Sequence, residues 1–182
     1  MDLPIDPLLP EISRILLKAG RLVLQAPPGA GKTSRVPLAL LDVIPDGKII
    51  LLEPRRLAAR AAAERLASSL GEPVGQRVGY RMRGDTRTGS RIEVVTEGVL
   101  TRMLQSDPDL PGISCLIFDE FHERSLNADL GLALAWEVRQ ALRSDLLILV
   151  MSATLDAQPV AELLDDAPVV TAEGRAFPVE IW

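Results

Sequence analysis

The sequence predicts an α/β domain in which helices cover both faces of a mostly parallel sheet. Apolar, β-branched runs recur along the chain, and segments with helical periodicity separate them. Most of these runs also lack the alternation of polar and apolar residues that marks a half-exposed strand. A chain of 182 residues is long enough for one good core and short for two, so residues 1–182 are expected to form a single domain.

Six apolar runs are predicted to be the strands of this sheet. In chain order they are RLVLQA (21–26), KIILLEP (48–54), RIEVVT (91–96), SCLIFD (114–119), LLILVMSAT (146–154) and APVVTA (167–172). Because strands alternate with helices, the connections are expected to be crossovers between parallel strands.

Two long segments between the strands have the periodicity of helices. Residues 55–71 form a small-residue helix that Gly71 is expected to close. The second helix, residues 127–144, is expected to begin with Asn127 as its N-cap. Residues 71–91 are rich in glycine and charge, which predicts an exposed excursion.

Composition excludes several classes of protein. No run approaches the roughly 18 uninterrupted apolar residues that a membrane helix needs, so no membrane partner is expected. The chain has one cysteine, Cys115, inside an apolar run. We expect a reduced core residue in a cytoplasmic protein, without a disulfide partner. One histidine and one cysteine make a zinc site very unfavourable.

The arginines are distributed unevenly. The net charge of −5 by itself argues against a nucleic-acid partner. However, residues 77–91 carry five arginines and one acidic residue, and residues 55–65 carry four more arginines. Such local groups could hold a polyanion or could form a solvated face, and the sequence leaves both readings open.

A glycine-rich loop follows the first predicted strand. Residues 24–34, LQAPPGAGKTS, nearly match the pattern of a phosphate-binding loop, with Ala26 where the first glycine is expected. Prolines 27 and 28 have no N–H, so the amides that face phosphate must begin at Gly29. The alternative is a Gly/Pro turn with a chance Lys-Thr pair. The candidate residues for binding the nucleotide are Gly29, Ala30, Gly31, Lys32, Thr33 and Ser34.

Two adjacent acids, Asp119 and Glu120, stand where a buried strand ends. Burying unpaired carboxylates is costly, so a metal and a triphosphate are the favoured explanation. Thr33 and Asp119 would ligate Mg²⁺, and Glu120 would orient and deprotonate the attacking water. His122 is a candidate relay, although a lone histidine is more often structural. The alternative for the acids is a solvated loop.

The segment DEFHERSLN (119–127) resembles motif II of the DEAH-box helicases of superfamily 2. Residues 52–67 are similar to motif Ia, and residues 78–85 and 95–104 to the segments around motif Ib. Residues 151–157 carry Ser-Ala-Thr as in motif III, and 174–182 resemble the strand that leads out of the first RecA-like lobe. Phe121, where most members have Ala, and the loop APPGAGKT are similar to the bacterial HrpB-type helicases.

The resemblance implies a RecA-like P-loop NTPase fold that binds ATP and Mg²⁺ at the strand ends. It implies Lys32, Asp119, Glu120 and His122 as catalytic residues, all on motifs that this chain carries. Ser152 and Thr154 would couple the nucleotide site to the nucleic-acid site.

The resemblance also implies a partner, single-stranded RNA, with DNA as the alternative. Arg55, Arg56 and Thr96 would contact its backbone. Arg65 would stack on the nucleobase of ATP, or alternatively form a surface pair with Glu64.

The function implied is that of an ATP-binding motor lobe of an ATP-dependent RNA helicase. The family's second lobe carries arginines that reach the γ-phosphate, and their Gln-Arg-x-Gly-Arg-x-Gly-Arg motif does not occur in this sequence. The isolated lobe is therefore expected to bind nucleotide and to hydrolyse it very slowly, with the second lobe as its partner. The alternatives are another kind of P-loop NTPase and a catalytically silent nucleic-acid-binding module.

Overall fold

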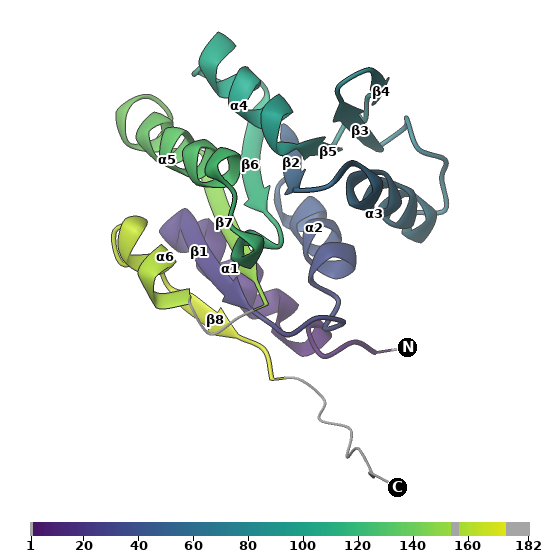
Figure 1. Ribbon diagram of the computed structural model, residues 1–182. Coiled ribbons are helices and arrows are strands. Elements are labelled where there is room, and N and C mark those ends of the chain that lie inside the picture. Colours follow the sequence, from purple (N-terminus) through teal and green to yellow (C-terminus); the bar gives the residue numbers. More distant parts are fainter. Residues whose placement is uncertain (1, 154–156, 174–182) are drawn as a thin grey trace, which may run out of the picture.

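A computed structural model describes residues 2–153 and 157–173, which form an eight-stranded sheet between two layers of helices (Figure 1). The strands are β1 (Arg21–Gln25), β2 (Lys48–Glu53), β3 (Val78–Met82), β4 (Asp85–Arg87), β5 (Ile92–Thr96), β6 (Ile113–Phe118), β7 (Leu147–Ser152) and β8 (Val169–Thr171). The helices are α1 (Leu9–Ala19), α2 (Lys32–Val43), α3 (Arg56–Ser69), α4 (Glu97–Ser106), α5 (Leu126–Ala141) and α6 (Ala157–Leu163), with 3₁₀ turns η1 (Asp6–Leu8) and η2 (Phe121–Glu123).

The sheet has the order β4-β3-β5-β2-β6-β7-β1-β8, and every pair except β3–β4 is parallel. This arrangement confirms the predicted α/β class. All six predicted strands are present with ends shifted by at most two residues within the described part of the chain.

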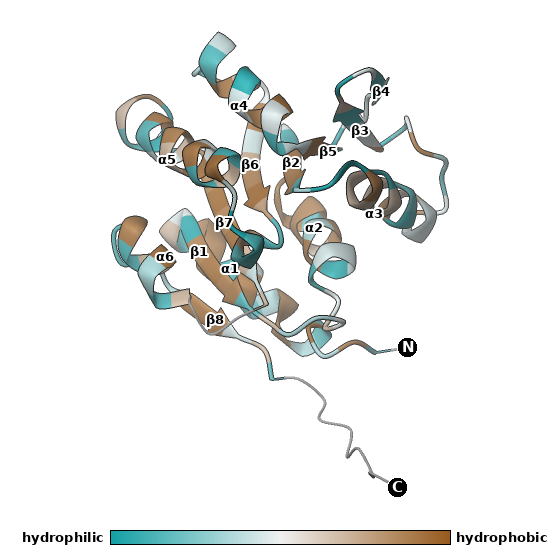
Figure 2. Ribbon diagram, in the orientation of Figure 1, coloured by the Kyte–Doolittle hydropathy of each residue, from teal (hydrophilic) through white to brown (hydrophobic). Residues whose placement is uncertain are grey.

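Two apolar cores fill the space between the sheet and its helical layers. One core joins the sheet to α1, α2 and α3, and the other joins it to α4, α5 and α6. The central strands are therefore apolar on both sides, and the outer faces of the helices carry most of the polar residues (Figure 2). Cys115 is buried in the first core, as predicted. In the described ranges, no helix combines the length and apolar character needed to cross a membrane.

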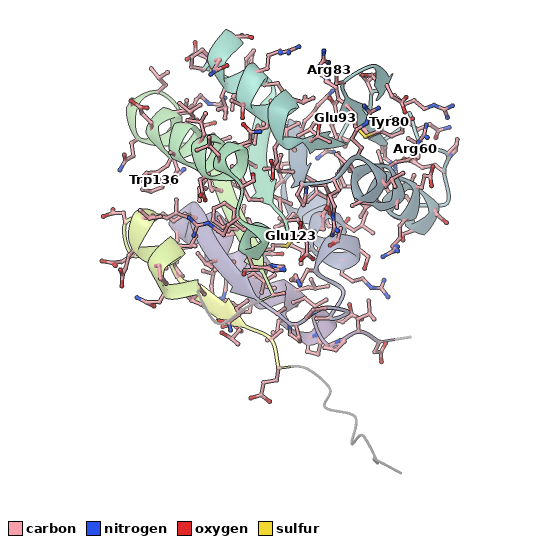
Figure 3. The ribbon with its side chains drawn as sticks, viewed as in Figure 1. Arg60, Tyr80, Arg83, Glu93, Glu123 and Trp136 are labelled. Atoms are coloured by element: carbon pink, nitrogen blue, oxygen red, sulfur yellow. The ribbon has the colours of Figure 1, made fainter. Side chains whose placement is uncertain are left out.

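The prediction that residues 71–91 form an exposed excursion is wrong for residues 78–82, whereas most of residues 83–91 are exposed. Residues 78–82 and 85–87 are strands, and Val78, Tyr80 and Met82 are buried in the core beside α3. The Tyr80 hydroxyl lies 3.1 Å from Arg60 Nη2 and 3.1 Å from Asp85 Oδ1, which fastens the β3–β4 hairpin to α3 (Figure 3). Backbone packing is tight here, because a Cβ on Gly79 would lie 2.2 Å from the carbonyl oxygen of Arg87.

The predicted end of α3 is confirmed. Gly71 has φ +71°, its N–H donates to the carbonyl of Ser68 (3.0 Å), and the next N–H, from Glu72, donates to Ala67 (3.1 Å). This is the Schellman arrangement that glycine permits at low cost.

The predicted start of α5 at Asn127 is wrong. The N-cap is Ser125, whose Oγ accepts from the Ala128 N–H (2.9 Å) and donates to Glu97 Oε2 (2.7 Å). A serine hydroxyl satisfies the third amide of the helix, and Asn127 is consequently an exposed residue of the first turn.

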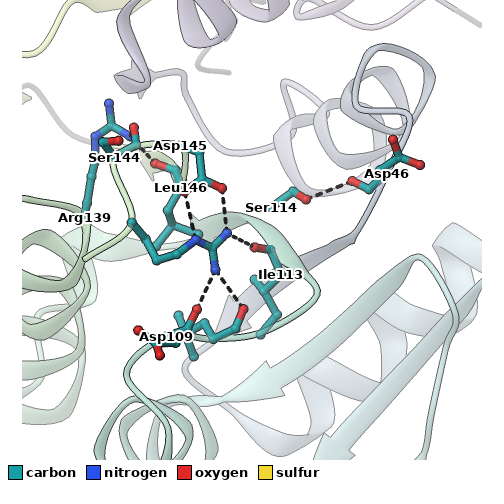
Figure 4. A network of polar contacts seen from close by, with 10 residues as sticks. Asp46, Asp109, Ile113, Ser114, Arg139, Ser144, Asp145 and Leu146 are labelled. Atoms are coloured by element: carbon teal, nitrogen blue, oxygen red, sulfur yellow. Dashed lines mark hydrogen bonds and ion pairs between the residues drawn. The ribbon is translucent and has the colours of Figure 1, made fainter.

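The amino ends of β6 and β7 are tied together by one arginine. Arg143 donates to the carbonyls of Asp109, Leu110 and Ile113 at 2.5–3.0 Å and pairs with Asp145 at 2.8 Å (Figure 4). This network closes the end of the sheet opposite the edge that carries the site described next.

Candidate active site

The segments singled out in the sequence converge at the carboxyl edge of the sheet. The phosphate loop follows β1, the acidic pair follows β6, and Ser152 ends β7, which lies between them. In parallel sheets this edge is the usual place for ligands.

The loop after β1 has the backbone that phosphate binding requires. Gly29 (φ +78°) and Gly31 (φ +97°) are both in the left-handed region, and Gly31 is the N-cap of α2. The first amides of α2 therefore face the loop, and among the described residues no side chain of the N-cap accepts from them. Ala26 stands where the motif has its first glycine, and the fold accommodates its side chain in the core. The Ala26 N–H continues the pairing of β1 by donating to the Ser152 carbonyl (3.0 Å).

Lys32 is a buried cation. The residue is only 4% exposed, and its Nζ donates to the carbonyls of Ala26 (2.8 Å) and Pro27 (3.4 Å). Within the described residues it has no carboxylate partner. A buried charge without a counter-charge is unfavourable, so this position is suited to an anionic ligand.

Thr33 and Asp119, 86 residues apart, are in direct contact. The Thr33 hydroxyl donates to Asp119 Oδ2, and the Asp119 N–H is held by the Leu52 carbonyl at 3.0 Å. Both side chains offer hard oxygen ligands. Mg²⁺ is usually bound by one or two such protein ligands, while phosphate and water oxygens complete its coordination shell. The residues present therefore fit this metal.

Glu120 and His122 form a second linked pair. Glu120 has φ +49°, a strained conformation for a residue with a side chain, and its N–H donates to Asp119 Oδ1 (2.8 Å). His122 Nε2 lies 3.2 Å from Glu120 Oε2, while Nδ1 accepts from the Ala153 N–H at 3.1 Å. An accepting Nδ1 places the proton of a neutral imidazole on Nε2, where it can be donated to Glu120.

The histidine therefore joins the acidic loop to the end of β7. Ser152 is buried there, at 6% exposure, and Ala153 follows it. Thr154, the other predicted coupling residue, lies outside the described residues, as does the predicted strand at 174–182.

Sequence reasoning missed Glu53, the last residue of β2. Glu53 is 3% exposed and hydrogen bonded to Asp119. Burial first, and then the negative charges of Asp119, Glu120 and Glu123, raise the pKa of Glu53 to about 9. The sequence does contain a signal for Glu53, because this acid ends the apolar run KIILLE in the same way that Asp119 ends the apolar run SCLIFD.

The predicted nucleic-acid residues lie beside this site. Arg55 is exposed and forms an ion pair with Glu123 at 2.8 Å. Arg56 is the exposed first residue of α3, and Thr96 is the N-cap of α4, in register with Glu53 across β5 and β2.

Arg65 is exposed on α3, and no contact within the described residues joins it to the phosphate loop or to Glu64. Several other arginines are engaged internally. Arg77 pairs with Glu72 (2.9 Å), Arg81 with Glu93 (2.7 Å) and Arg60 with Asp85 (3.0 Å). For these three, the structure favours a stabilising role over a patch that is free to hold a polyanion.

Comparison with known proteins identifies the family of this chain. The model of the DEAD/DEAH box helicase family matches residues 10–163. The chain is 57% identical to the ATP-dependent RNA helicase HrpB of Escherichia coli over 98% of its length, and 34% identical to the HrpA homologue of Haemophilus influenzae over 99%. It covers 22% and 14% of those relatives, so it spans only a small part of each.

Solved structures give the same result. A crystal structure of the E. coli DEAH/RHA helicase HrpB superposes with a TM-score of 0.93 and 57% identity, covering 98% of this chain and 23% of that one. The predicted RecA-like fold and the HrpB-type resemblance are thereby confirmed. The chain belongs to the DEAD/DEAH box helicase family.

Proposed function

We propose that this chain is the ATP-binding motor lobe of an ATP-dependent RNA helicase. The observation that carries the proposal is the buried Lys32 ammonium beside the Thr33–Asp119 pair. A loop with two left-handed glycines, an uncompensated cation and two hard oxygen ligands is suited to a triphosphate with its metal. The helicase relatives support the same function.

Each residue of the loop has a distinct role in this proposal. The amides from Gly29 to Ser34 and the Lys32 ammonium bind the phosphates. Thr33 and Asp119 hold Mg²⁺, which neutralises charge on the phosphoryl group when bound. The loop hydrogen bonds to Ala26 and Pro27 keep Lys32 directed along the loop.

Hydrolysis is assigned to the acidic loop. Glu120 orients a water and accepts its proton. His122 holds the Glu120 carboxylate through Nε2 and the Ala153 amide through Nδ1, so a shift at either end is transmitted to the other. Ser152 and Thr154, which precede and follow Ala153 in the sequence, are the proposed coupling residues.

For the nucleic acid we propose single-stranded RNA, with DNA as a possible second substrate. Arg55, Arg56 and Thr96 would contact its sugar-phosphate backbone, which carries no sequence information. The exposed positions of both arginines support this. Arg65 is the proposed stacking residue for the base of ATP, which implies weak base selectivity.

We further propose that residues 1–182 form one RecA-like domain that works with a second lobe of the same polypeptide in the cytoplasm. The single sheet and the small share of each relative that the chain covers support this arrangement. Alone, the lobe binds nucleotide and turns it over slowly.

Binding of ADP·Mg to the wild type and to Lys32→Ala tests the proposal. Removing the cation is expected to weaken binding at least about tenfold, since charge-assisted hydrogen bonds contribute about 1.5–3 kcal/mol each. Lys18→Ala, which removes an exposed lysine of α1, is the matched control and should leave binding unchanged. Equal affinities for the wild type and Lys32→Ala would instead favour a catalytically silent module.

A further inference from the structure

The amino-terminal segment Leu3–Asp6 lies directly against the phosphate loop. Figure 1 shows this end of the chain beside the connection from β1 to α2. Ile5 is fully buried, and its N–H donates to the carbonyl of Ala30 at 3.1 Å. The loop is therefore held by a main-chain hydrogen bond from outside the β1–α2 unit.

Apolar side chains from the same segment fill the space next to Gly31. A Cβ built on Gly31 would lie 2.6 Å from Leu3 Cδ1 and 3.3 Å from Ile5 Cγ2. Gly31 has φ +97°, so this residue has both the backbone and the surroundings that exclude a side chain. Leu3 and Ile5 thus pack against the backbone of the residue that precedes Lys32.

Two polar contacts fasten the segment. The Leu3 N–H donates to Asp6 Oδ2 at 2.7 Å, and Asp6 Oδ1 lies 3.4 Å from Nε of Arg35, in the first turn of α2. The segment is consequently joined to both the loop and the helix that follows it. The Asp6–Arg35 pair is partly exposed and adds little by itself, so Leu3 and Ile5 are the main contacts.

We propose that Leu3 and Ile5 are positioning residues for nucleotide binding, which brace the phosphate loop in its binding conformation before the ligand arrives. The inference rests on the proposed nucleotide site. A loop of glycines is costly to order, and a ligand that must order it loses part of its binding free energy. The packing of Leu3 and Ile5 at Gly31 and the hydrogen bond from Ile5 to Ala30 keep the loop ordered in the free protein.

Titration of N-methylanthraniloyl-ADP·Mg into the wild type, Leu3→Ala and Ile5→Ala tests the brace at a temperature well below unfolding. We expect affinity to fall about three- to tenfold in each variant, the size of an added ordering cost. The control is Leu104→Ala, which removes a buried leucine of α4 in the other core. It should lower the melting temperature and leave the affinity unchanged.

Hydrogen exchange of the free protein gives a second readout. Leu3→Ala should speed amide exchange in residues 29–34 and leave exchange in β7 unchanged, whereas Leu104→Ala should not affect the loop selectively. Should an alanine variant not fold, Leu3→Val and Ile5→Val replace it, with a smaller effect of the same kind.

The outcomes separate the brace from the nucleotide site. If Lys32→Ala loses binding but Leu3→Ala and Ile5→Ala bind and exchange like the wild type, the brace is refuted and the nucleotide site stands. If the wild type does not bind the probe, the proposed function fails, and selective loop exchange in Leu3→Ala still decides whether the segment orders the loop. Equal weakening by Leu104→Ala would also overturn the brace.

Discussion

At the scale of single residues, the candidate site contains a cluster of carboxylates that the fold brings together from separate strands. Glu53 ends β2 and Asp119 follows β6, the adjacent strand. Both residues are buried, at 3% and 4% exposure. Two buried acids in contact cannot both ionise without a large electrostatic cost, so the pair retains a proton near neutral pH. Burial, and then the neighbouring charge of Asp119, raise the pKa of Glu53 to about 9.

This proton makes stability depend on pH. The unfolded chain loses the Glu53 proton near its ordinary value of 4.5, while the folded chain keeps it until about pH 9. Between these values the folded state binds more protons, so Glu53 lowers the free energy of unfolding as pH rises, by up to about 1.4 kcal/mol per unit. Glu53→Gln keeps a neutral donor and removes this dependence. Its stability relative to the wild type should therefore increase from pH 5.5 to pH 8, by at least about 1 kcal/mol.

Urea denaturation at a series of pH values measures the difference. Glu162→Gln, which neutralises an exposed acid of α6, is the control and should show no comparable trend. A difference between Glu53→Gln and the wild type that stays constant from pH 5.5 to pH 8 would contradict the prediction.

At the scale of elements, continuous apolar runs were predicted well and alternating ones were not. β2, β6 and β7 are covered on both faces, so their apolar runs are unambiguous. In β3, Val78, Tyr80 and Met82 face α3, while Arg81 faces the other side and pairs with Glu93. The alternation was present in VGYRM, but the surrounding glycines and arginines concealed it.

The candidate site was predicted in the same uneven way. The phosphate loop and the residues around Asp119 have local spacing that reveals their chemistry, and the structure brings Thr33 and Asp119 together. The contact of Glu53 with Asp119 depends on the adjacency of β2 and β6, which no short motif encodes. The packing of Leu3 against Gly31 is likewise a tertiary contact without a local pattern.

The start of α5 gives a prediction at this scale. The Ser125 hydroxyl both caps the helix and donates to Glu97 in the first turn of α4, so one group joins two helices beside the acidic loop. Ser125→Ala is expected to lower the free energy of unfolding by about 1–2 kcal/mol through the lost cap and the unpaired carboxylate.

Asn127→Ala is a matched control, because Asn127 is exposed in the same turn and does not cap the helix. It should change stability by no more than about 0.5 kcal/mol, as is usual for surface positions. Chemical denaturation of both variants measures the two values. Equal losses would show that Ser125 is not the residue that holds the helix end.

At the scale of the whole molecule, the described residues of the candidate site are suited to binding a triphosphate, and none of them supplies an arginine to the γ-phosphate side. In the proposed function, Lys32 and the amides of the loop would face one side of a triphosphate, and Glu120 held by His122 would act as the base. Among the described residues no guanidinium contacts Lys32, Thr33, Asp119 or Glu120. An arginine that stabilises the negative charge of the transition state typically raises kcat by a factor of about 10³–10⁵.

We therefore predict that these 182 residues bind ATP·Mg and hydrolyse it at no more than about 0.01 s⁻¹, about 10³ below a typical enzyme turnover of about 10 s⁻¹. Single-stranded RNA should raise the rate little, because the contacts proposed for Arg55 and Arg56 would hold its backbone without supplying an arginine to the γ-phosphate. Phosphate release at saturating ATP·Mg, with and without oligouridylate, measures both rates, and Lys32→Ala gives the background. Nucleotide binding measured in the same solution shows that a low rate does not arise from an empty site. Robust turnover that RNA stimulates and Lys32→Ala abolishes would mean that residues of this chain alone stabilise the negative charge of the transition state. The proposal that a second lobe supplies this stabilisation would then be wrong.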